Sequence, residues 1–326
     1  MEKRIAAWAP GDRIAGPFLI RESRLVDFKN KPGRYLHLVL ADRSGEIEAR
    51  LWEDGETHVL QCQSGSIVFF TGEVVSFNNA LQLKLTSLRS VEKGEYQQED
   101  FVPAAPRPIA DMRSELAGIV AEMKPGSART LAEAVLKASW FETFLRAPAA
   151  KKNHHNYLGG LLEHTLGVMR LAKAVGTAVP NVDRDLLITG ALLHDIGKTR
   201  EMNFFPGIEY TDEGRLIGHI VLGIQMTEAL MEPLGLPESF RLRIQHMLAS
   251  HHGEYEWQSP KRPKFVEARL LHLIDLMDAD VFKFQSVSPD SPGSHWSAFV
   301  RNIGNPVFLG LENEHESVAY FDESRE

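Results

Sequence analysis

The apolar residues of this chain change their spacing partway along it, from strict alternation to a helical repeat. Between Phe18 and Arg89, apolar and polar residues alternate in short runs, which indicates strands with one buried face. After Met112, apolar residues recur one helical turn apart, which indicates amphipathic helices. The chain is therefore predicted to be multidomain, with a small all-β barrel followed by an all-α bundle.

Five strand-like runs make up the first part. A hairpin turn is predicted at Asp42-Arg43-Ser44-Gly45, and Asn78-Asn79 tolerates the left-handed backbone that a second turn needs. A short helical break is expected between Asp54 and Gln61. Five short strands with such a break match an OB-type barrel. The runs are FLIRESRLV, YLHLVLA, EIEARLW, SIVFFTGEVVSF and ALQLKLTSL.

Composition places the domain boundaries. We assign residues 1–94 to the barrel and residues 95–111, which are polar and then rich in proline, to an interdomain linker. The helical domain follows at 112–285. Residues 286–326 form a C-terminal extension that is expected to be partly flexible. The helices are expected at 112–124, 128–146, 153–177, 183–196, 214–232, 237–251 and 263–285.

Charge and cysteine content narrow the function classes. The chain carries a net charge of −8, but residues 1–94 sum to +1, so the barrel is the better surface for a polyanion. No run approaches the roughly 18 apolar residues of a membrane helix, and no signal-peptide core follows the first residues, so a cytoplasmic protein is expected. A single cysteine, Cys62, leaves metal binding to histidine and carboxylate.

Seven histidines and aspartates lie in or at the ends of the predicted apolar helices. One such residue alone is more often a satisfied core residue than a ligand. Burying all of them without a shared cation would be costly, because each needs a charged or hydrogen-bonding partner. Imidazole and carboxylate suit Mn, Fe, Zn, Ni or Co. The seven are His164, His194, Asp195, His219, His251, His252 and Asp275.

An adjacent histidine and aspartate at a helix end can serve two metals. His194 can bind a first ion while the carboxylate of Asp195 bridges to a second. Two-metal sites hold their ions about 3.5 to 4 Å apart, and there they activate water and clamp a phosphate. The predicted chemistry is phosphodiester hydrolysis.

The chain resembles a known family at these positions. HDIGK at 194–198, within the order His, His-Asp, His, His, Asp, resembles the HD-domain metal hydrolases. The order of an OB-type barrel followed by such a helical domain resembles the YhaM-type 3′-5′ exoribonucleases. Two segments of the helical domain add to this resemblance, NHHNYLGGLLEHTLGV at 153–168 and EYTDEGRLIGHIVLG at 209–223. The resemblance spans roughly residues 14 to 285.

The resemblance implies a ligand set and a substrate. It implies that one metal is bound by His164, His194, Asp195 and Asp275, and a second by Asp195, His219 and His251. His252 stays open, because a third metal would need a carboxylate one turn before His164, where this chain has Gly160. The resemblance also implies two divalent ions, with manganese favoured over Fe, Co, Ni or Zn, and a single-stranded RNA that is shortened from its 3′ end to nucleoside 5′-monophosphates.

Three further polar residues near these ligands have two interpretations each. Lys198 contacts a substrate phosphate or stabilises a helix C-terminus at the surface. His154, after Lys151 and Lys152, meets the incoming phosphate or only caps and solvates the helix that carries His164. Asp278 shares a helix face with Asp275 and supports a ligand or is merely solvated.

The barrel offers a basic and aromatic surface for a single strand. OB barrels bind strands by backbone electrostatics and base stacking, although about half of such aromatics in a small barrel are core residues. Coupling to a phosphodiesterase domain makes single-stranded RNA or DNA the preferred ligand. The candidate residues are Phe28, Lys29, Lys31, Arg34, Tyr35, Arg50 and Trp52.

Other functions remain open from the sequence. A nucleotide or cyclic-nucleotide phosphohydrolase would use the same ligands with a barrel that only mediates assembly. A di-iron oxygenase would use the same helical scaffold for redox chemistry. A single-strand-binding protein without turnover is the non-catalytic alternative, and a homo-oligomer is compatible with each of these.

Overall fold

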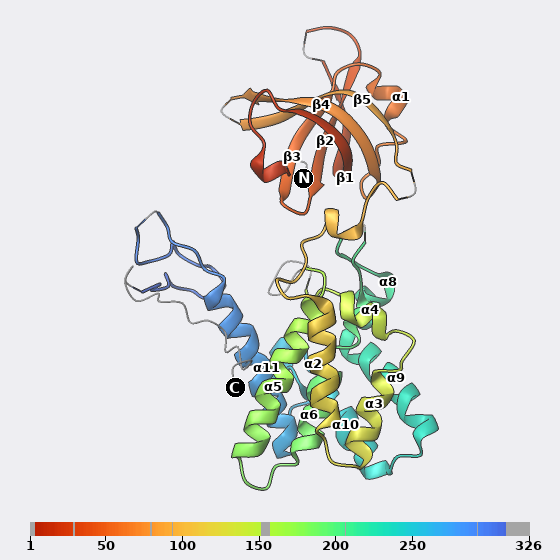
Figure 1. The fold of residues 1–326 in the computed structure, drawn as a ribbon, viewed down its shortest axis with the longest axis vertical. Helices are drawn as coiled ribbons and strands as arrows, with labels where there is room; N and C mark the ends of the chain where they lie inside the picture. The colour runs from red at the N-terminus through yellow and green to blue at the C-terminus, as the bar shows by residue number, and fades with distance from the viewer. Residues whose placement is uncertain are drawn as a thin grey trace.

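A computed structural model shows a β-barrel and a helical domain joined in series, with an arm at the C-terminal end (Figure 1). No helix of the described residues has both the length and the apolar composition needed to cross a membrane. The structure describes residues 4–28, 30–78, 80–92, 94–150, 157–205, 207–291 and 293–310.

The first domain is a closed barrel with the strand order β1-β2-β3-β5-β4. All neighbouring strands are antiparallel except β3 and β5, and β1 closes the barrel on β4. Leu36, Leu38 and Leu40 of one strand face the core, so alternate residues of β2 face outward. The elements are β1 (Arg13–Asp27), β2 (Arg34–Asp42), β3 (Gly45–Leu51), α1 (Gly55–His58), β4 (Ile67–Phe77) and β5 (Ala80–Ser90). The predicted five-stranded OB barrel with a helical break is confirmed.

The second domain is helical, as predicted, but two expected helices are each broken in two. The segment 128–146 is interrupted between Val135 and Phe141, and 214–232 is interrupted at Gly218, whose φ of +79° ends one helix and starts the next. The elements are α2 (Ile109–Ala121), α3 (Ser127–Val135), α4 (Phe141–Arg146), α5 (Gly160–Ala178), α6 (Arg184–Leu193), α7 (Lys198–Glu201), β6 (Met202–Asn203), β7 (Glu209–Tyr210), α8 (Asp212–Ile217), α9 (His219–Met231), α10 (Glu238–Ser250) and α11 (Val266–Gln285).

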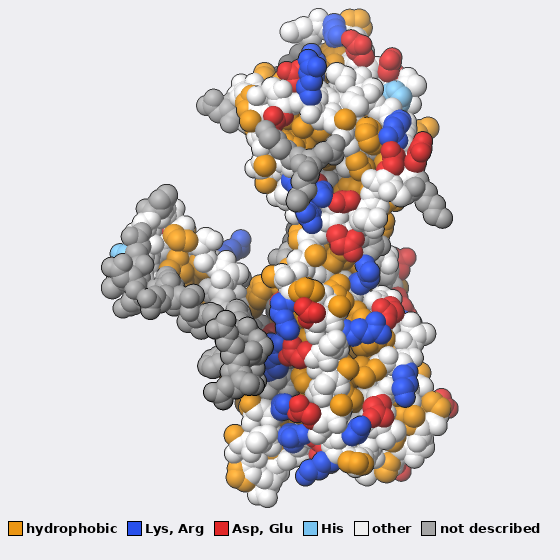
Figure 2. All heavy atoms as spheres, viewed as in Figure 1, with side chains coloured by type: hydrophobic (Ala, Val, Ile, Leu, Met, Phe, Trp, Pro, Cys, Tyr) orange, Lys and Arg blue, Asp and Glu red, His pale blue; other side chains and the backbone are white. Residues whose placement is uncertain are grey.

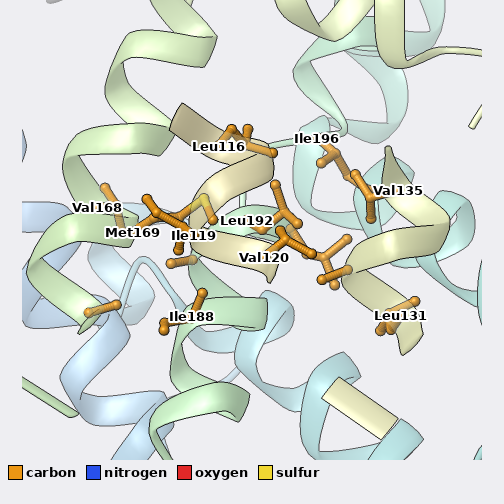
Figure 3. Packing of buried hydrophobic residues seen from close by; sticks show 14 of the residues in the cluster. Leu116, Ile119, Val120, Leu131, Val135, Val168, Met169, Ile188, Leu192 and Ile196 are labelled. Carbon is orange, nitrogen blue, oxygen red and sulfur yellow. The ribbon is translucent and has the colours of Figure 1, made fainter. Parts of the chain in front are cut away.

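Helix α6 is buried at the centre of this domain. Every residue from Leu186 to Leu193 is buried, and the surrounding helices supply apolar side chains to one continuous core. In Figure 3, Leu116 and Val120 of α2 and Val168 of α5 lie around Ile188 and Leu192 of α6. A rigid, fully packed α6 gives a fixed position to the His194-Asp195 pair at its end.

The predicted linker is packed between the two domains. Phe101 is 1% exposed and packs with Leu19 and Ala41 of the barrel. Tyr96 of the linker stacks on Phe205, which lies in the β6–β7 hairpin of the helical domain, with ring centroids 6.1 Å apart.

Backbone hydrogen bonds hold the linker to both domains. The Arg43 amide of the barrel donates to Asp100 O, and the Leu158 amide, just before α5, donates to Pro103 O at 2.7 Å. The linker is therefore a docked strap rather than a free tether.

After α11 the chain continues as an arm, defined here as residues 286–310. Figure 1 shows it projecting from the helical domain at the end of α11. Trp296 bridges to Phe308 and Val300 to Asn305, so the arm folds back on itself. On the face seen in Figure 2, basic and acidic side chains are interspersed over the helical domain, and hydrophobic side chains are visible on the arm.

We expect Phe101→Ala to loosen the docking of the two domains. Removing a buried phenylalanine costs about 3 to 5 kcal/mol, and here the loss falls on the contact between domains. Limited proteolysis should then cleave within residues 95–111 much faster than in the wild type. Tyr255→Ala, which removes an aromatic ring that is 57% exposed, is the control and should leave the cleavage rate unchanged. Equal cleavage rates of Phe101→Ala and wild type would contradict the docking of the linker through Phe101.

Candidate metal centre and strand-binding surface

Five helices bring the predicted histidines and aspartates to one place. His164 lies in the first turns of α5, and His194 is the C-cap of α6, followed at once by Asp195. His219 opens α9 and His251 is the C-cap of α10, followed by His252. Asp275 lies midway along α11. Most of these residues sit at helix ends, where side chains from different helices can converge.

A glycine allows the central turn to approach α9. A Cβ atom on Gly197 would lie 1.9 Å from the carbonyl oxygen of His219, so no other residue fits without moving the backbone. This close approach sets the turn after α6 against the start of α9. It thereby brings Asp195 beside His219.

Four of the residues form a first group. His164 Nε2 lies 3.1 Å from His194 Nε2 and 3.2 Å from Asp275 Oδ1. Asp195 Oδ2 lies 3.4 Å from His194 Nε2 and 3.6 Å from His164 Nε2. All four ligand atoms therefore face a common point, which fits the first predicted metal site.

The other oxygen of Asp195 faces a second group. Asp195 Oδ1 lies 3.6 Å from His219 Nε2 and 3.7 Å from His251 Nε2. His252 belongs here as well, because a ligand atom from each of the three histidines lies within 4.8 Å of the others. The sequence left the place of His252 open, and the structure puts it in the second group.

Each histidine of the cluster is oriented by a hydrogen bond at Nδ1, which leaves Nε2 facing inward. Three rings donate to backbone carbonyls: His194 to Ala191, His251 to Leu248 and His252 to Trp257. Two rings bond carboxylates.

The two carboxylates come from neighbouring helices. His164 Nδ1 lies 2.7 Å from Asp278 Oδ2, and His219 Nδ1 lies 3.0 Å from Glu201 Oε1. Such outer partners fix the ring orientation of a metal ligand and raise its basicity. Of the two interpretations of Asp278, this contact favours support of a ligand, whereas Glu201 was not anticipated from the sequence.

Unsatisfied buried atoms show that the cluster fits a cation. Asp195 Oδ1, His219 Nε2 and His251 Nε2 are buried and have no hydrogen-bond partner among the described residues. Leaving a buried polar atom unpaired costs about 1 to 3 kcal/mol. All three atoms belong to the second group, and one divalent cation suited to imidazole and carboxylate would satisfy them together.

Protonation states favour metal binding at the second group. Burial, reinforced by the neighbouring His252 and His194, holds the pKa of His251 well below its usual value, so its ring is neutral. Burial also lowers the pKa of His252, with His219 adding to the effect. Although burial opposes it, Lys198 and His194 hold the pKa of Asp195 well below its usual range. Neutral imidazole and ionised carboxylate are the forms that bind metal.

His164 differs from these rings. Burial lowers its pKa, but hydrogen bonds to Asp275 and Asp278 outweigh burial and raise the pKa to about 10. A metal at this position would therefore displace a proton from His164.

Lys198 does not lie on the surface at a helix C-terminus, which was one of its two interpretations. It is the first residue of α7, its side chain is 13% exposed, and Nζ donates to Asp195 Oδ2 at 2.6 Å. The ammonium therefore lies beside the carboxylate that the two groups share. His154 lies outside the described residues.

On the barrel, three of the predicted aromatic residues form one cluster. The ring centroids of Tyr35 and Trp52 are 4.6 Å apart, and Phe28 lies 5.4 and 6.0 Å from them. Trp52 is 37% exposed. None of the three belongs to the barrel core, so the alternative of core aromatics does not apply to them.

Basic side chains surround this aromatic cluster. Lys31 Nζ lies 4.1 Å above the Phe28 ring, and the Arg50 guanidinium lies 5.6 Å from the Trp52 ring. Arg34 instead pairs with Glu56, and Lys29 lies outside the described residues.

Phe77, at the end of β4, was missed by the sequence reasoning. Its ring lies 5.6 Å from the Arg50 guanidinium, which places it at this surface. A signal for it was its place at the end of a strand run, beside the Asn78-Asn79 turn.

A closed five-stranded barrel and a helical domain that gathers this His and Asp cluster define an OB-fold protein with an HD domain. Residues 21–91 match the family model described as an OB-fold nucleic acid binding domain, and residues 161–282 match the HD domain.

Whole-chain relatives then identify the family. A 3′-5′ exoribonuclease YhaM of Listeria welshimeri is 34% identical over 309 residues, which cover 94% of this chain and 98% of that protein. The protein of the same name from Bacillus subtilis is 36% identical over 281 residues, which cover 86% and 88% of the two chains. The chain belongs to the YhaM family of 3′-5′ exoribonucleases.

We expect Glu201→Gln to weaken metal binding. Loss of the carboxylate leaves the His219 ring without its charged partner, and changes of this kind typically cost 10- to 100-fold in metal affinity. Calorimetric titration of the metal-free protein with Mn²⁺ measures the change. Glu213→Gln is the matched control, because Glu213 pairs with Arg200 at the surface nearby. Equal affinities for Glu201→Gln and wild type would contradict the role of Glu201.

Proposed function

We propose that this chain is a metal-dependent 3′-5′ exoribonuclease that releases nucleoside 5′-monophosphates from single-stranded RNA. The observation that carries the proposal is the shared carboxylate: the two oxygens of Asp195 face two separate groups of ligand atoms. Family membership supplies the direction of degradation and the RNA substrate, through the names of the relatives. Single-stranded DNA is included as a second substrate to be tested.

The ligand set proposed for the two ions follows the two groups. His164, His194, Asp195 and Asp275 would hold one ion, and Asp195, His219, His251 and His252 the other. Manganese is the proposed metal. Divalent cations at these positions would activate water and neutralise charge that develops on the phosphate.

The chain's own residues then position the substrate. Asp195 would hold both ions at once and so fix their separation. Although burial opposes it, Asp195 raises the pKa of Lys198, so this side chain remains a cation. We propose that its ammonium turns from Asp195 to a phosphate oxygen of the substrate, where it would act as a point charge. His154 is proposed to meet the same phosphate from the segment before α5.

The barrel is proposed to hold the strand that the helical domain shortens. Bases would stack on the aromatic cluster, and the basic residues around it would follow the backbone. The proposed contacts are Phe28, Lys29, Lys31, Arg34, Tyr35, Arg50 and Trp52.

The strap at 95–111 supports a division of labour between the domains. We propose residues 1–94 as the strand-binding domain, 112–285 as the catalytic domain and 286–326 as the C-terminal extension. Because the strap bonds to Leu158, two residues before α5 begins, the barrel is anchored close to the helix that carries His164. A strand that leaves the barrel would then have a fixed route to the metal centre.

We expect Asp195→Ala to abolish degradation of RNA. The substitution removes a ligand from both groups, so activity should fall by at least the 100-fold that loss of a supporting residue alone can cost. The assay follows a 5′-labelled single-stranded RNA and a DNA of the same sequence, with Mn²⁺ or EDTA. Wild type should give a ladder that shortens from the 3′ end with Mn²⁺ only, whereas Asp195→Ala should leave the RNA intact.

The control for this experiment is Asp111→Ala, which alters an exposed aspartate on α2 and should retain the ladder. If the wild type leaves the RNA intact with each of several metals, the proposal is wrong. Mononucleotides hydrolysed in its place would point to a nucleotide phosphohydrolase, and oxygen consumption with iron would point to an oxygenase.

We expect Trp52→Ala to weaken RNA binding without changing the metal centre. Loss of one stacking platform costs about 1 to 3 kcal/mol per base, which corresponds to roughly 5- to 150-fold in affinity. Fluorescence anisotropy with a labelled single-stranded RNA in EDTA measures binding without hydrolysis. Leu60→Ala, at an exposed barrel residue outside the cluster, should bind as the wild type does. Unchanged binding by Trp52→Ala would exclude this face as the strand-binding surface.

A further inference from the structure

The outward face of α11 is apolar. Its inward face packs Ala268, Leu271 and Ile274 into the helical core, but five large apolar residues point away from that core. A helix on a protein surface normally carries polar residues on its solvent side, and a helix that is apolar all round is normally buried. The five residues are Val266, Leu273, Met277, Val281 and Phe284, each between 43% and 53% exposed.

These five residues form one continuous stripe. At 100° per residue they fall within an arc of roughly 80°, and they extend over nearly the whole helix, about 30 Å long. Arg269 and Asp280 are exposed beside the stripe on the same side. Charges of both signs in so small a number are unlike the Lys- and Arg-rich polar face of a helix that binds membrane surfaces.

The apolar surface continues into the arm. Trp296, Phe299 and Phe308 are 53%, 66% and 52% exposed, and the rings of Trp296 and Phe308 are 5.1 Å apart. Among the described residues of the arm, only Ser297 and Val307 are buried. A segment this short cannot build a core of its own, so its aromatic rings need a surface from elsewhere.

We propose that the stripe and the arm form the surface through which this chain pairs with a second copy of itself. The stripe is self-complementary in the antiparallel sense. Val266 and Phe284 lie nine residues before and after Asp275, and Leu273 and Met277 lie two residues before and after it. A two-fold axis at the level of Asp275 therefore sets four of the five apolar residues opposite another one, Val266 opposite Phe284 and Leu273 opposite Met277.

The same symmetry brings opposite charges together. Arg269 lies six residues before the midpoint and Asp280 five residues after it, on the same side of the stripe. In the antiparallel pair, each Arg269 faces Asp280 of the second copy, twice per dimer.

The exposed area is of the size that a dimer interface uses. Half-exposed aromatic side chains leave on the order of 100 Å² each to be covered. The four aromatic residues of the stripe and arm then supply on the order of 400 Å² per copy, and the four aliphatic residues add to this, toward the roughly 800 Å² that one partner contributes to an interface of standard size. Pairing would also restrain the helix whose inner face carries Asp275 and Asp278.

The first test is the mass of the full-length chain, measured by light scattering across a dilution series. We expect the wild type to have an even multiple of the 36.6 kDa chain mass. Met277→Glu should halve that mass, because it places charge in the middle of the stripe, and it should weaken association at least 100-fold. Leu242→Glu alters a residue of α10 that is 57% exposed and lies outside the surface, so it should keep the wild-type mass.

A monomeric wild type at every concentration would overturn the proposal. So would a Met277→Glu variant with the wild-type mass, or a Leu242→Glu variant that dissociates equally. Circular dichroism of each variant checks that a lower mass does not reflect unfolding.

The second test distinguishes antiparallel from parallel pairing by cross-linking cysteines. In the antiparallel pair, position 266 of one copy faces position 284 of the other, while the two copies of either position lie about 27 Å apart. A mixture of Val266→Cys and Phe284→Cys should therefore cross-link, and each variant alone should not. Burial raises the pKa of Cys62 to about 11, so the native thiol stays unreactive. Cross-linking within either variant alone, or none in the mixture, would overturn the antiparallel pair.

Discussion

The shared carboxylate of Asp195 is the contact on which the metal centre depends. Its two oxygens face different groups of histidines, and each group comes from different helices. That arrangement requires α6 to end at a fixed point, which the burial of every residue from Leu186 to Leu193 provides. It also requires the turn after α6 to press against α9, which Gly197 permits. The buried core of the helical domain therefore holds the Asp195 side chain in place.

Orientation of the rings is the second constraint. Three of the histidines in the cluster are aligned by carbonyl oxygens, so their alignment follows from the backbone alone. His164 and His219 depend on carboxylates from other elements. Glu201 is followed directly by the β6–β7 hairpin, and that hairpin carries Phe205 to the strap. The short segment from Glu201 to Phe205 thus connects the orientation of the His219 ring to the interface between the two domains.

The sequence predicted those features that depend on local pattern. Alternation of apolar residues gave the five strands, and the seven candidate ligands could be recognised because each lies among apolar helical residues. Features that depend on a single backbone angle or a distant partner could not be predicted in this way. Gly218 splits one expected helix because of its positive φ, Glu201 pairs with a residue 18 positions away, and the place of His252 depends on the carbonyl of Trp257.

The docked strap has a consequence for dividing the molecule into parts. Phe101 covers Leu19 and Ala41 on the outside of the barrel, so a barrel that ended at residue 94 would expose both to water. The helical domain without the strap would lose the partner of the Leu158 amide, next to the start of α5. Each half therefore relies on the strap for contacts at its surface. A chimaera that exchanges either domain would have to carry residues 95–111 and both of their contact surfaces with it.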